Sequence, residues 1–141
     1  MTLVIPRVWI SGEKEATDDR WLKKNNITHI LNCAVEVDYF PPENVKYAKI
    51  FLDDSLEQDI SKSVNLAADH IYACLYEGGN VLVHCAAGIS RSVSMVIAYL
   101  IKYHDMDYKN AYDTVSKKRK IAYPNKSFQT QLKKFQTKIH K

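Results

Sequence analysis

The stretch VLVHCAAGISR, residues 81–91, gathers residue types that can bind and attack a phosphate group. Arg91 carries a planar guanidinium, which holds two phosphate oxygens at once in a way that lysine cannot. Gly88 allows a backbone bend that a side chain would obstruct. Cys85 supplies a thiol, and a thiolate held beneath a tetrahedral phosphoryl group is a nucleophile in line with its target. The residue types and their spacing therefore favour phosphoryl chemistry.

Two elements position these residues. An apolar strand over 81–85 delivers the cysteine to its carboxyl end, and a helix begins at Arg91. In proteins with parallel α/β sheets, ligands bind at the edge of the sheet formed by the carboxyl ends of the strands. The N–H groups of the intervening loop can point at one centre beside the positive end of the helix dipole, and this field favours thiolate over thiol. The predicted phosphate-binding residues are Ala86, Ala87, Gly88, Ile89, Ser90 and Arg91.

The rest of the chain alternates between strand and helix patterns. The predicted strands are residues 8–11, 27–33, 47–52 and 81–85. The predicted helices begin at a cap on Thr17 or Asp18, at a cap on Ser61 or Ser63, at Arg91, at Tyr108 and after Pro124. We expect one α/β domain over residues 1–141, with a central, mostly parallel sheet of four to five strands and helices on both faces.

The segment HCAAGISRS, residues 84–92, resembles the HCxxGxxRS signature of the cysteine-dependent dual-specificity protein phosphatases. The resemblance continues through PRVWISG, ITHILN, AYLI and AYPNKSFQTQL and leaves out only the ends of the chain. It implies a protein tyrosine phosphatase-like fold. The PN-x-x-F-x-x-QL tail and the upstream strand make this match more specific than a cysteine and an arginine at the right spacing would be.

The resemblance also implies roles for individual residues. Cys85 attacks phosphorus and becomes a phosphocysteine, while Arg91 and the loop amides stabilise the equatorial oxygens. Ser92 assists the thiolate as leaving group when the intermediate is hydrolysed. His84 orients the loop and tunes the cysteine, although a buried hydrogen bond alone would also explain a histidine there.

A general acid must protonate the leaving oxygen. The stretch YAKIFLDDSLEQDI offers four carboxylates, namely Asp53, Asp54, Glu57 and Asp59. Family members present one Asp about thirty residues before the cysteine, and register on the isoleucine of the preceding strand places it at Asp54. Asp53 stays open as the alternative, because only register separates the two.

Two further residues have two interpretations each. Asn125 follows a proline and precedes a helical pattern, which favours a helix N-cap, with a contact to the phosphate-binding loop as the alternative. Cys33 ends a strand expected beside the Cys85 strand, where it is either a small core residue or, by resemblance to lipid-phosphatase relatives, a disulfide partner of oxidised Cys85. Cys74 fits a helix core face.

The charge of the chain is divided between its two ends. Residues 1–113 carry 11 basic against 16 acidic residues, a net charge of −5, whereas residues 114–141 carry nine basic residues and no acid, a net charge of +9. The run KKRK, residues 117–120, could be a nuclear localisation signal, but its place at the end of a helix favours a solvated turn. We expect no nucleic-acid partner.

Composition narrows the class of protein further. Three cysteines do not make a disulfide framework, and the histidines are too scattered for a metal site, so we expect neither a metal nor a cofactor. The N-terminus has no signal-peptide pattern, no myristoylation glycine follows Met1, and no apolar run reaches about 18 residues. We therefore expect a cytoplasmic protein that could also enter the nucleus, with no membrane anchor.

The length of 141 residues leaves no room for the segments that build a deep phosphotyrosine pocket, which favours a shallow site for both phosphotyrosine and phosphoserine or phosphothreonine. The expected partners are phosphorylated proteins, a protein kinase possible among them, with phosphate, sulfate, vanadate or tungstate as ligands.

A phosphoinositide or RNA 5′-phosphatase is the first alternative function, although Ala86, Ala87 and Ile89 stand where lipid-directed loops carry lysines. A noncatalytic phosphoprotein-binding module is the second, although Cys85, Arg91 and Ser92 are all present.

Overall fold

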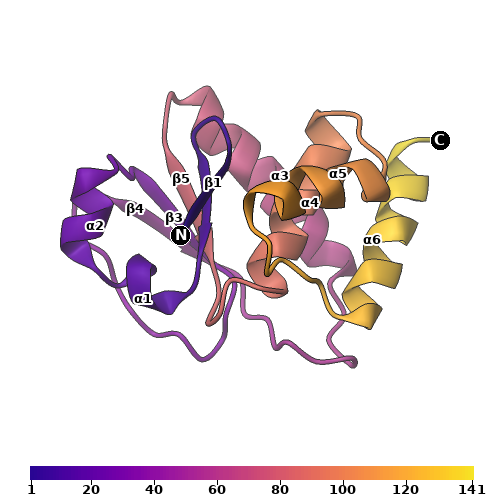
Figure 1. The fold of residues 1–141 in the computed structure, drawn as a ribbon, viewed down its shortest axis with the longest axis horizontal. Helices are drawn as coiled ribbons and strands as arrows, with labels where there is room; N and C mark the ends of the chain where they lie inside the picture. The colour runs from indigo at the N-terminus through magenta and orange to yellow at the C-terminus, as the bar shows by residue number, and fades with distance from the viewer.

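The computed structural model describes residues 1–141, in which five strands and six helices follow one another in pairs, with single elements α3 and β5 in the middle and three helices at the end (Figure 1). The elements are β1 (Thr2–Ile5), β2 (Val8–Ser11), α1 (Glu13–Ala16), α2 (Asp19–Lys24), β3 (His29–Asn32), β4 (Lys46–Lys49), α3 (Ser61–Tyr76), β5 (Val81–His84), α4 (Arg91–Tyr103), α5 (Tyr108–Lys118) and α6 (Lys126–Ile139).

The five strands form one sheet in the order β1-β2-β5-β3-β4. Four of them are parallel, while β1 runs antiparallel to β2. Ser11 and Asn32 pair with His84 from either side, so the carboxyl ends of β2, β3 and β5 meet at one edge. The predicted mostly parallel sheet is confirmed, and the predicted phosphate-binding loop leaves from its central strand.

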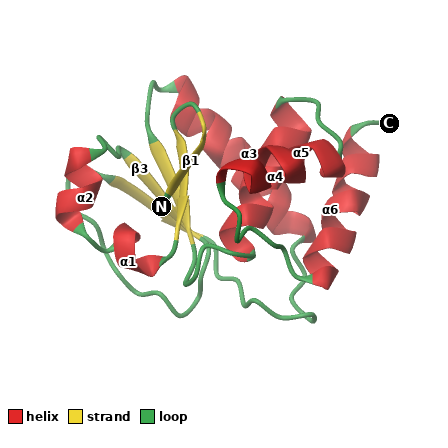
Figure 2. Cartoon of the chain, viewed as in Figure 1, coloured by secondary structure: helices red, strands yellow, loops and turns green.

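Helices cover both faces of the sheet, as predicted (Figures 1 and 2). The larger face packs against α3, α4, α5 and α6 through residues such as Val83, Ile97 and Phe128, which are fully buried. The opposite face packs against α1 and α2 through a smaller cluster that includes Leu22 and Leu82. Burial of β5 on both faces explains its continuous apolar sequence.

Strand β1 was not predicted. Pro6 and Arg7 form a two-residue turn between β1 and β2, with Arg7 in the left-handed region at φ 67. Proline has a fixed negative φ, and a negative φ followed by a positive one is the pattern of a type II turn, in which proline is common at the first central position. The short helix α1 was also missed, because four residues are too few for a helical pattern to show in the sequence.

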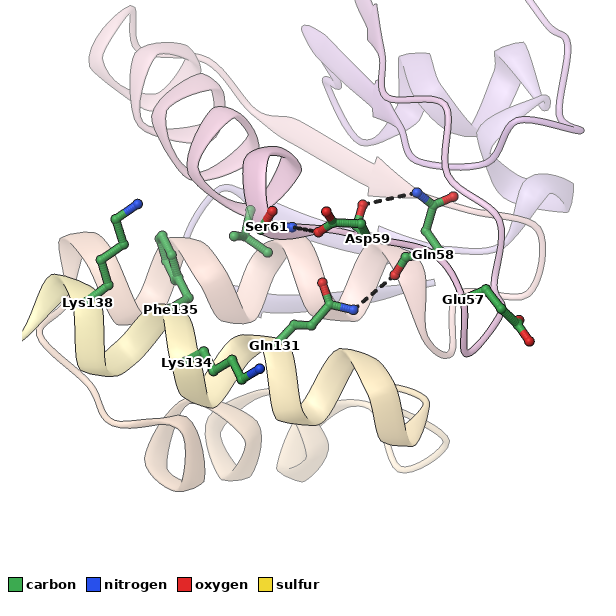
Figure 3. Close-up of a pocket in the computed structure, with 9 residues that line it drawn as sticks. Glu57, Gln58, Asp59, Ser61, Gln131, Lys134, Phe135 and Lys138 are labelled. Atoms are coloured by element: carbon green, nitrogen blue, oxygen red, sulfur yellow. Dashed lines mark hydrogen bonds between the residues drawn. The ribbon is translucent and has the colours of Figure 1, made fainter.

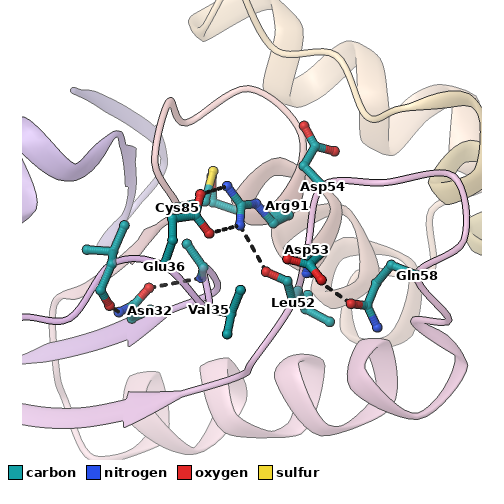
Figure 4. A network of polar contacts seen from close by, with 12 residues as sticks. Asn32, Val35, Glu36, Leu52, Asp53, Asp54, Gln58, Cys85 and Arg91 are labelled. Carbon is teal, nitrogen blue, oxygen red and sulfur yellow. Dashed lines mark hydrogen bonds and ion pairs between the residues drawn. The ribbon is translucent and has the colours of Figure 1, made fainter.

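Strand β4 is shorter than the predicted 47–52. Ile50 still donates its N–H to Asn32 on β3, at 2.8 Å, but Leu52 then donates to the Ile50 carbonyl at 3.1 Å, which turns the chain away from the sheet. The segment from Ile50 to Ile60, which we call the acid loop, therefore leaves the sheet edge early and passes beside Arg91, which donates to the Leu52 carbonyl (Figure 4).

Of the predicted helix caps, two are confirmed and one is wrong. Asp18 caps α2 by accepting from the N–H groups of Arg20 and Trp21, and Asn125 caps α6 by accepting from Phe128. Helix α3 begins without a serine cap, because Asp59 accepts the N–H of Ser61 at 2.8 Å and takes over that function.

Candidate active site

The loop that joins β5 to α4, residues 85–91, curls around the Cys85 thiol, and we call it the phosphate loop. Gly88 donates its N–H to Cys85 Sγ at 3.2 Å, and the Ser92 hydroxyl lies 3.2 Å from the same sulfur. Gly88 has φ +69, a conformation that side-chain-bearing residues rarely adopt. Cys85 is 2% exposed, so any nucleophilic attack by its sulfur takes place in a largely desolvated site.

The other N–H groups of the phosphate loop have no partner in the protein. The backbone donors of this group make no hydrogen bond within the chain and belong to Ala86, Ala87, Ile89, Ser90 and Arg91. They lie between the carboxyl end of β5 and the amino end of α4, where the helix dipole favours negative charge. An oxyanion with several acceptor atoms is the ligand that would satisfy such a set.

Arg91 is anchored by a carboxylate that sequence reasoning missed (Figure 4). Its Nη1 and Nη2 atoms donate to the two carboxylate oxygens of Glu36 at 2.6 and 2.7 Å, and Nη1 also donates to the Leu52 carbonyl at 2.9 Å. Its Nε atom is buried and has no partner. The Nε–H group is therefore left for a ligand, while the outer edge of the guanidinium is held by the protein.

The charges of this ion pair stabilise one another. The hydrogen bonds from Arg91 lower the pKa of Glu36 to about 2. The Glu36 carboxylate in turn raises the pKa of Arg91, with burial opposing the shift. Glu36 follows β3 at the same sheet edge as Cys85, and that position is the only signal in the sequence that could have identified it.

Among the four candidate acids, only Asp54 is tied to the residues around the phosphate loop. Its Oδ1 accepts a hydrogen bond from Asn125 Nδ2 at 2.9 Å, and its charge acts on the pKa of Arg91. Figure 4 shows the Asp54 side chain extending away from Asp53, whose N–H instead donates to Gln58 at 2.9 Å. These contacts favour Asp54 over Asp53, and the assignment of the acid stays a prediction.

Asn125 fulfils both interpretations that the sequence allowed. It caps α6, and its backbone N–H donates to Ser90 Oγ in the phosphate loop at 2.9 Å. Because its side-chain amide also donates to Asp54, a single residue links α6, the phosphate loop and the acid loop.

Gln131, the glutamine of the QL pair in the tail motif, fixes the far end of the acid loop (Figure 3). Its side-chain oxygen accepts the Ile60 N–H at 2.7 Å, and its amide nitrogen donates to the Gln58 carbonyl at 2.9 Å. The motif therefore has a physical role that the sequence alone did not reveal. Glu57 and Asp59, the two remaining acid candidates, line a surface pocket here beside Gln131, which does not include Cys85.

His84 is buried, and its Nδ1 lies 3.2 Å from the Cys85 carbonyl. Burial lowers the pKa of His84 to about 4, so the ring is neutral at neutral pH and donates to that carbonyl through Nδ1–H. A neutral, buried donor fits the predicted role of orienting the loop and does not suit a general acid.

Cys33 lies beside Cys85 at the ends of adjacent strands, since its N–H donates to the His84 carbonyl at 2.8 Å. It is fully buried, and burial, followed by the proximity of Cys85, raises the pKa of the Cys33 thiol. All three cysteines are free thiols, and Cys74 is buried in the main core, as predicted. The placement fits both interpretations of Cys33, and its disulfide with Cys85 stays a prediction.

The KKRK run forms the predicted solvated end of a helix at its three lysines but not at Arg119. Lys117, Lys118 and Lys120 are exposed, whereas Arg119 is 8% exposed and contacts the phosphate loop.

No helix is both long and apolar enough to span a bilayer. No group of three or more His, Cys, Asp or Glu side chains is arranged to hold a metal ion.

A thiol, a row of free amides and an anchored arginine at the carboxyl edge of a parallel sheet form a site for a tetrahedral oxyanion, as in cysteine-based phosphatases. The family described as dual specificity phosphatase, catalytic domain, matches residues 8–138, and the chain belongs to this family.

Relatives and solved structures agree with this assignment. The chain is 38% identical to dual specificity protein phosphatase 1B of Arabidopsis thaliana, over 94% of this chain and 79% of that protein. It is also 38% identical to dual specificity protein phosphatase 22 of Homo sapiens, over 96% of this chain and 73% of that protein. A mouse dual specificity phosphatase, solved in complex with zinc tungstate, matches with a TM-score of 0.93 at 25% identity, over 99% of this chain and 87% of that one.

Proposed function

We propose that this domain hydrolyses phosphotyrosine and phosphoserine or phosphothreonine in proteins through a phosphocysteine intermediate. One observation carries the proposal: the Cys85 sulfur accepts the Gly88 N–H and lies beside the Ser92 hydroxyl, in a loop whose other amides and the Nε of Arg91 are unpaired. These donors surround the position that three phosphoryl oxygens would occupy above the sulfur.

In the first step, the Cys85 thiolate attacks phosphorus, so that an S–P bond forms while the bond from phosphorus to the ester oxygen breaks. The electron pair of that bond leaves on the ester oxygen, which takes a proton from the protonated Asp54 carboxyl. Arg91 and the loop amides stabilise the charge on the equatorial oxygens. The products are a dephosphorylated hydroxyl and phosphocysteine.

In the second step, a water molecule attacks the phosphocysteine while the Asp54 carboxylate accepts its proton. The S–P bond breaks and the electron pair returns to Cys85 as a thiolate, which the Ser92 hydroxyl, 3.2 Å away, stabilises by donating a hydrogen bond. Inorganic phosphate leaves, and Asp54 is protonated again for the next cycle. The cycle needs no residue beyond those already at the site.

The proposed substrate range is supported by the relatives and by the phosphate loop. The relatives named dual specificity protein phosphatase support activity on both kinds of phosphoresidue. The side chains of Ala86, Ala87 and Ile89 carry no charge, which supports a phosphoprotein over a polyanionic phosphoinositide headgroup. A protein kinase among the substrates and a cytoplasmic or nuclear location stay predictions.

Hydrolysis of an aryl phosphate by the wild type, Cys85→Ser and Asp54→Ala tests the mechanism, with Asp53→Ala as the matched control. We expect Cys85→Ser to lose turnover completely, and Asp54→Ala to lose it on a poor leaving group, whereas Asp53→Ala keeps it. Retention of wild-type turnover by Cys85→Ser would refute the mechanism. Comparable activity on phosphotyrosine and phosphothreonine peptides is expected, and a preference for phosphoinositides over both would contradict the proposed substrate class.

A further inference from the structure

The four carbonyl groups of residues 86–89 in the phosphate loop accept hydrogen bonds from outside the loop, which directs them away from the anion site. The Ala86 oxygen accepts the Glu13 N–H at the start of α1 at 2.9 Å. The Ile89 oxygen accepts the Tyr123 N–H at 2.7 Å. Each peptide unit has its N–H and C=O on opposite sides, so holding the carbonyls outward leaves the amides facing inward.

The two carbonyls in the middle of the loop are held by one side chain, Arg119. Its Nε donates to the Gly88 carbonyl at 2.7 Å, and its Nη2 lies 3.4 Å from the Ala87 carbonyl. Gly88 is therefore held from both sides, with its N–H on the Cys85 sulfur and its C=O on Arg119. The Ala87 carbonyl shares its peptide unit with the Gly88 N–H, and the Gly88 carbonyl shares its unit with the Ile89 N–H, so Arg119 acts on the two peptide units at the centre of the loop.

Arg119 is buried without a carboxylate partner. It is 8% exposed, it takes part in no ion pair, and its third contact is the Thr2 hydroxyl on β1, which accepts from Nη1 at 2.9 Å. Burial lowers the pKa of Arg119, and the nearby Glu15 carboxylate opposes that shift, although arginine stays charged at any physiological pH. A positive charge close behind the loop, hydrogen-bonded only to carbonyl and hydroxyl oxygens, adds to the attraction for an anion in front of it.

The Arg119 guanidinium and the Ser11 backbone pack closely against Gly88, which leaves no space for a side chain there. A Cβ atom at Gly88 would lie 2.5 Å from Arg119 Nη2 and 2.7 Å from the Ser11 carbonyl oxygen. The glycine is thus required both by its positive φ and by the arginine packed against it.

We propose that Arg119 is a positioning residue of the anion site: it orients the central peptides of the phosphate loop and supplies charge from behind, without touching the ligand. The inference rests on the proposed function only in taking residues 85–91 as the anion site. It separates Arg119 from the three lysines of the same basic run, which are exposed and contact no part of that loop.

Tungstate binding tests this inference without any need for turnover. The binding affinity is measured by calorimetry in a Cys85→Ser background, alone and combined with Arg119→Met, Arg119→Lys, or the controls Lys118→Met and Lys120→Met. We expect Arg119→Met to weaken binding at least about tenfold, since it removes charge-assisted hydrogen bonds from the loop. The tungstate affinity of Arg119→Lys should lie between those of the background and Arg119→Met, because lysine keeps the charge but not the planar set of donors. The lysine variants should bind as the background does.

Circular dichroism and thermal denaturation of each variant accompany the binding measurement. A folded Arg119→Met or Arg119→Lys variant that binds tungstate with the affinity of the background would overturn the inference. Loss of the fold in both variants would overturn it as well, because Arg119 would then be a residue of global stability. If the wild type binds tungstate with this dependence on Arg119 yet hydrolyses no phosphate ester, the proposed function fails and the positioning role stands.

Discussion

Among individual residues, Glu36 has the clearest consequence for function. It holds the outer edge of Arg91 through two hydrogen bonds, so that the guanidinium presents its free Nε to the ligand. Because the Glu36 side chain is 52% exposed, water screens part of the interaction, and its effect is smaller than that of a fully buried pair.

Replacing Glu36 by glutamine is therefore expected to lower kcat/KM for a small aryl phosphate roughly fivefold, mainly through KM, since an unanchored arginine binds the phosphoryl group less well. Asp38→Asn, on the same loop, is the matched control because Asp38 is exposed and makes no ion pair. Steady-state kinetics on both variants provide the measurement. Equal kinetic constants for Glu36→Gln and Asp38→Asn would show that the ion pair has no role in binding.

His84 makes the stability of the protein depend on pH. Its pKa is about 4 in the folded protein against 6.5 in the unfolded chain, so below pH 6.5 the unfolded state takes up a proton that the native state does not. Stability is therefore lost as pH falls from about 6.5 to 4, by roughly 3 kcal/mol for this group.

Urea unfolding between about pH 8 and pH 4.5, on the wild type and His84→Gln, measures this contribution. The free energy of unfolding of the wild type is expected to fall faster with acidification than that of the variant, while the two stay parallel above pH 7. Parallel curves over the whole range would mean that His84 does not cause the acid sensitivity.

The residues found from the sequence are close together along the chain or, like Asp54, were placed by the resemblance. Cys85, Arg91 and Ser92 lie in one short motif, and local geometry alone brings them to the same site. Glu36 was missed because it is far from Arg91 in sequence, and only the parallel pairing of β3 with β5 places it there.

Among the elements, the acid loop depends on α6 for its position. Gln131 binds the loop at the Gln58 carbonyl and the Ile60 N–H, and Asn125 binds it at Asp54. The strand pattern of residues 47–52 did not reveal this arrangement, since the apolar pattern continues to Leu52, whereas the chain turns away from the sheet after Ile50. Periodicity does not distinguish a short strand from a buried turn of similar composition.

Gln131→Ala is expected to lower kcat on a poor leaving group about tenfold, because a loosened acid loop places the Asp54 carboxyl less accurately. Tungstate affinity is expected to stay near that of the wild type, since the phosphate loop is untouched. Thr130→Ala, on the exposed face of α6, serves as the control. An equal loss on good and poor leaving groups would indicate that Gln131 does not act through the acid.

At the scale of the whole molecule, the basic segment 114–141 contains two kinds of basic residue. One is Arg119, a buried cation that contacts the phosphate loop, and the others are eight lysines. The sequence could not separate them, because Arg119 lies within KKRK and its partners, Gly88 and Thr2, are distant in the chain. The fold class, in contrast, was predictable, since alternating strand and helix patterns require a parallel sheet covered on both faces.

The double variant Lys134→Gln with Lys138→Gln removes two exposed charges of α6. Turnover of a small aryl phosphate is expected to stay within about twofold of the wild type, because exposed charges contribute little to stability and are screened by salt. Kinetics at moderate ionic strength provide the measurement. A large loss of turnover in a folded variant would mean that the basic segment takes part in the reaction.

The covalent intermediate itself can be observed. An aryl phosphate with a good leaving group needs no acid to form phosphocysteine, but hydrolysis of the intermediate needs Asp54 as base, so the intermediate accumulates in Asp54→Ala. Rapid quenching followed by mass spectrometry of the peptide that contains Cys85 is the decisive measurement. We predict one added phosphoryl group on Cys85 in that variant. Turnover by the wild type with no phosphate on Cys85 in either protein would contradict the mechanism.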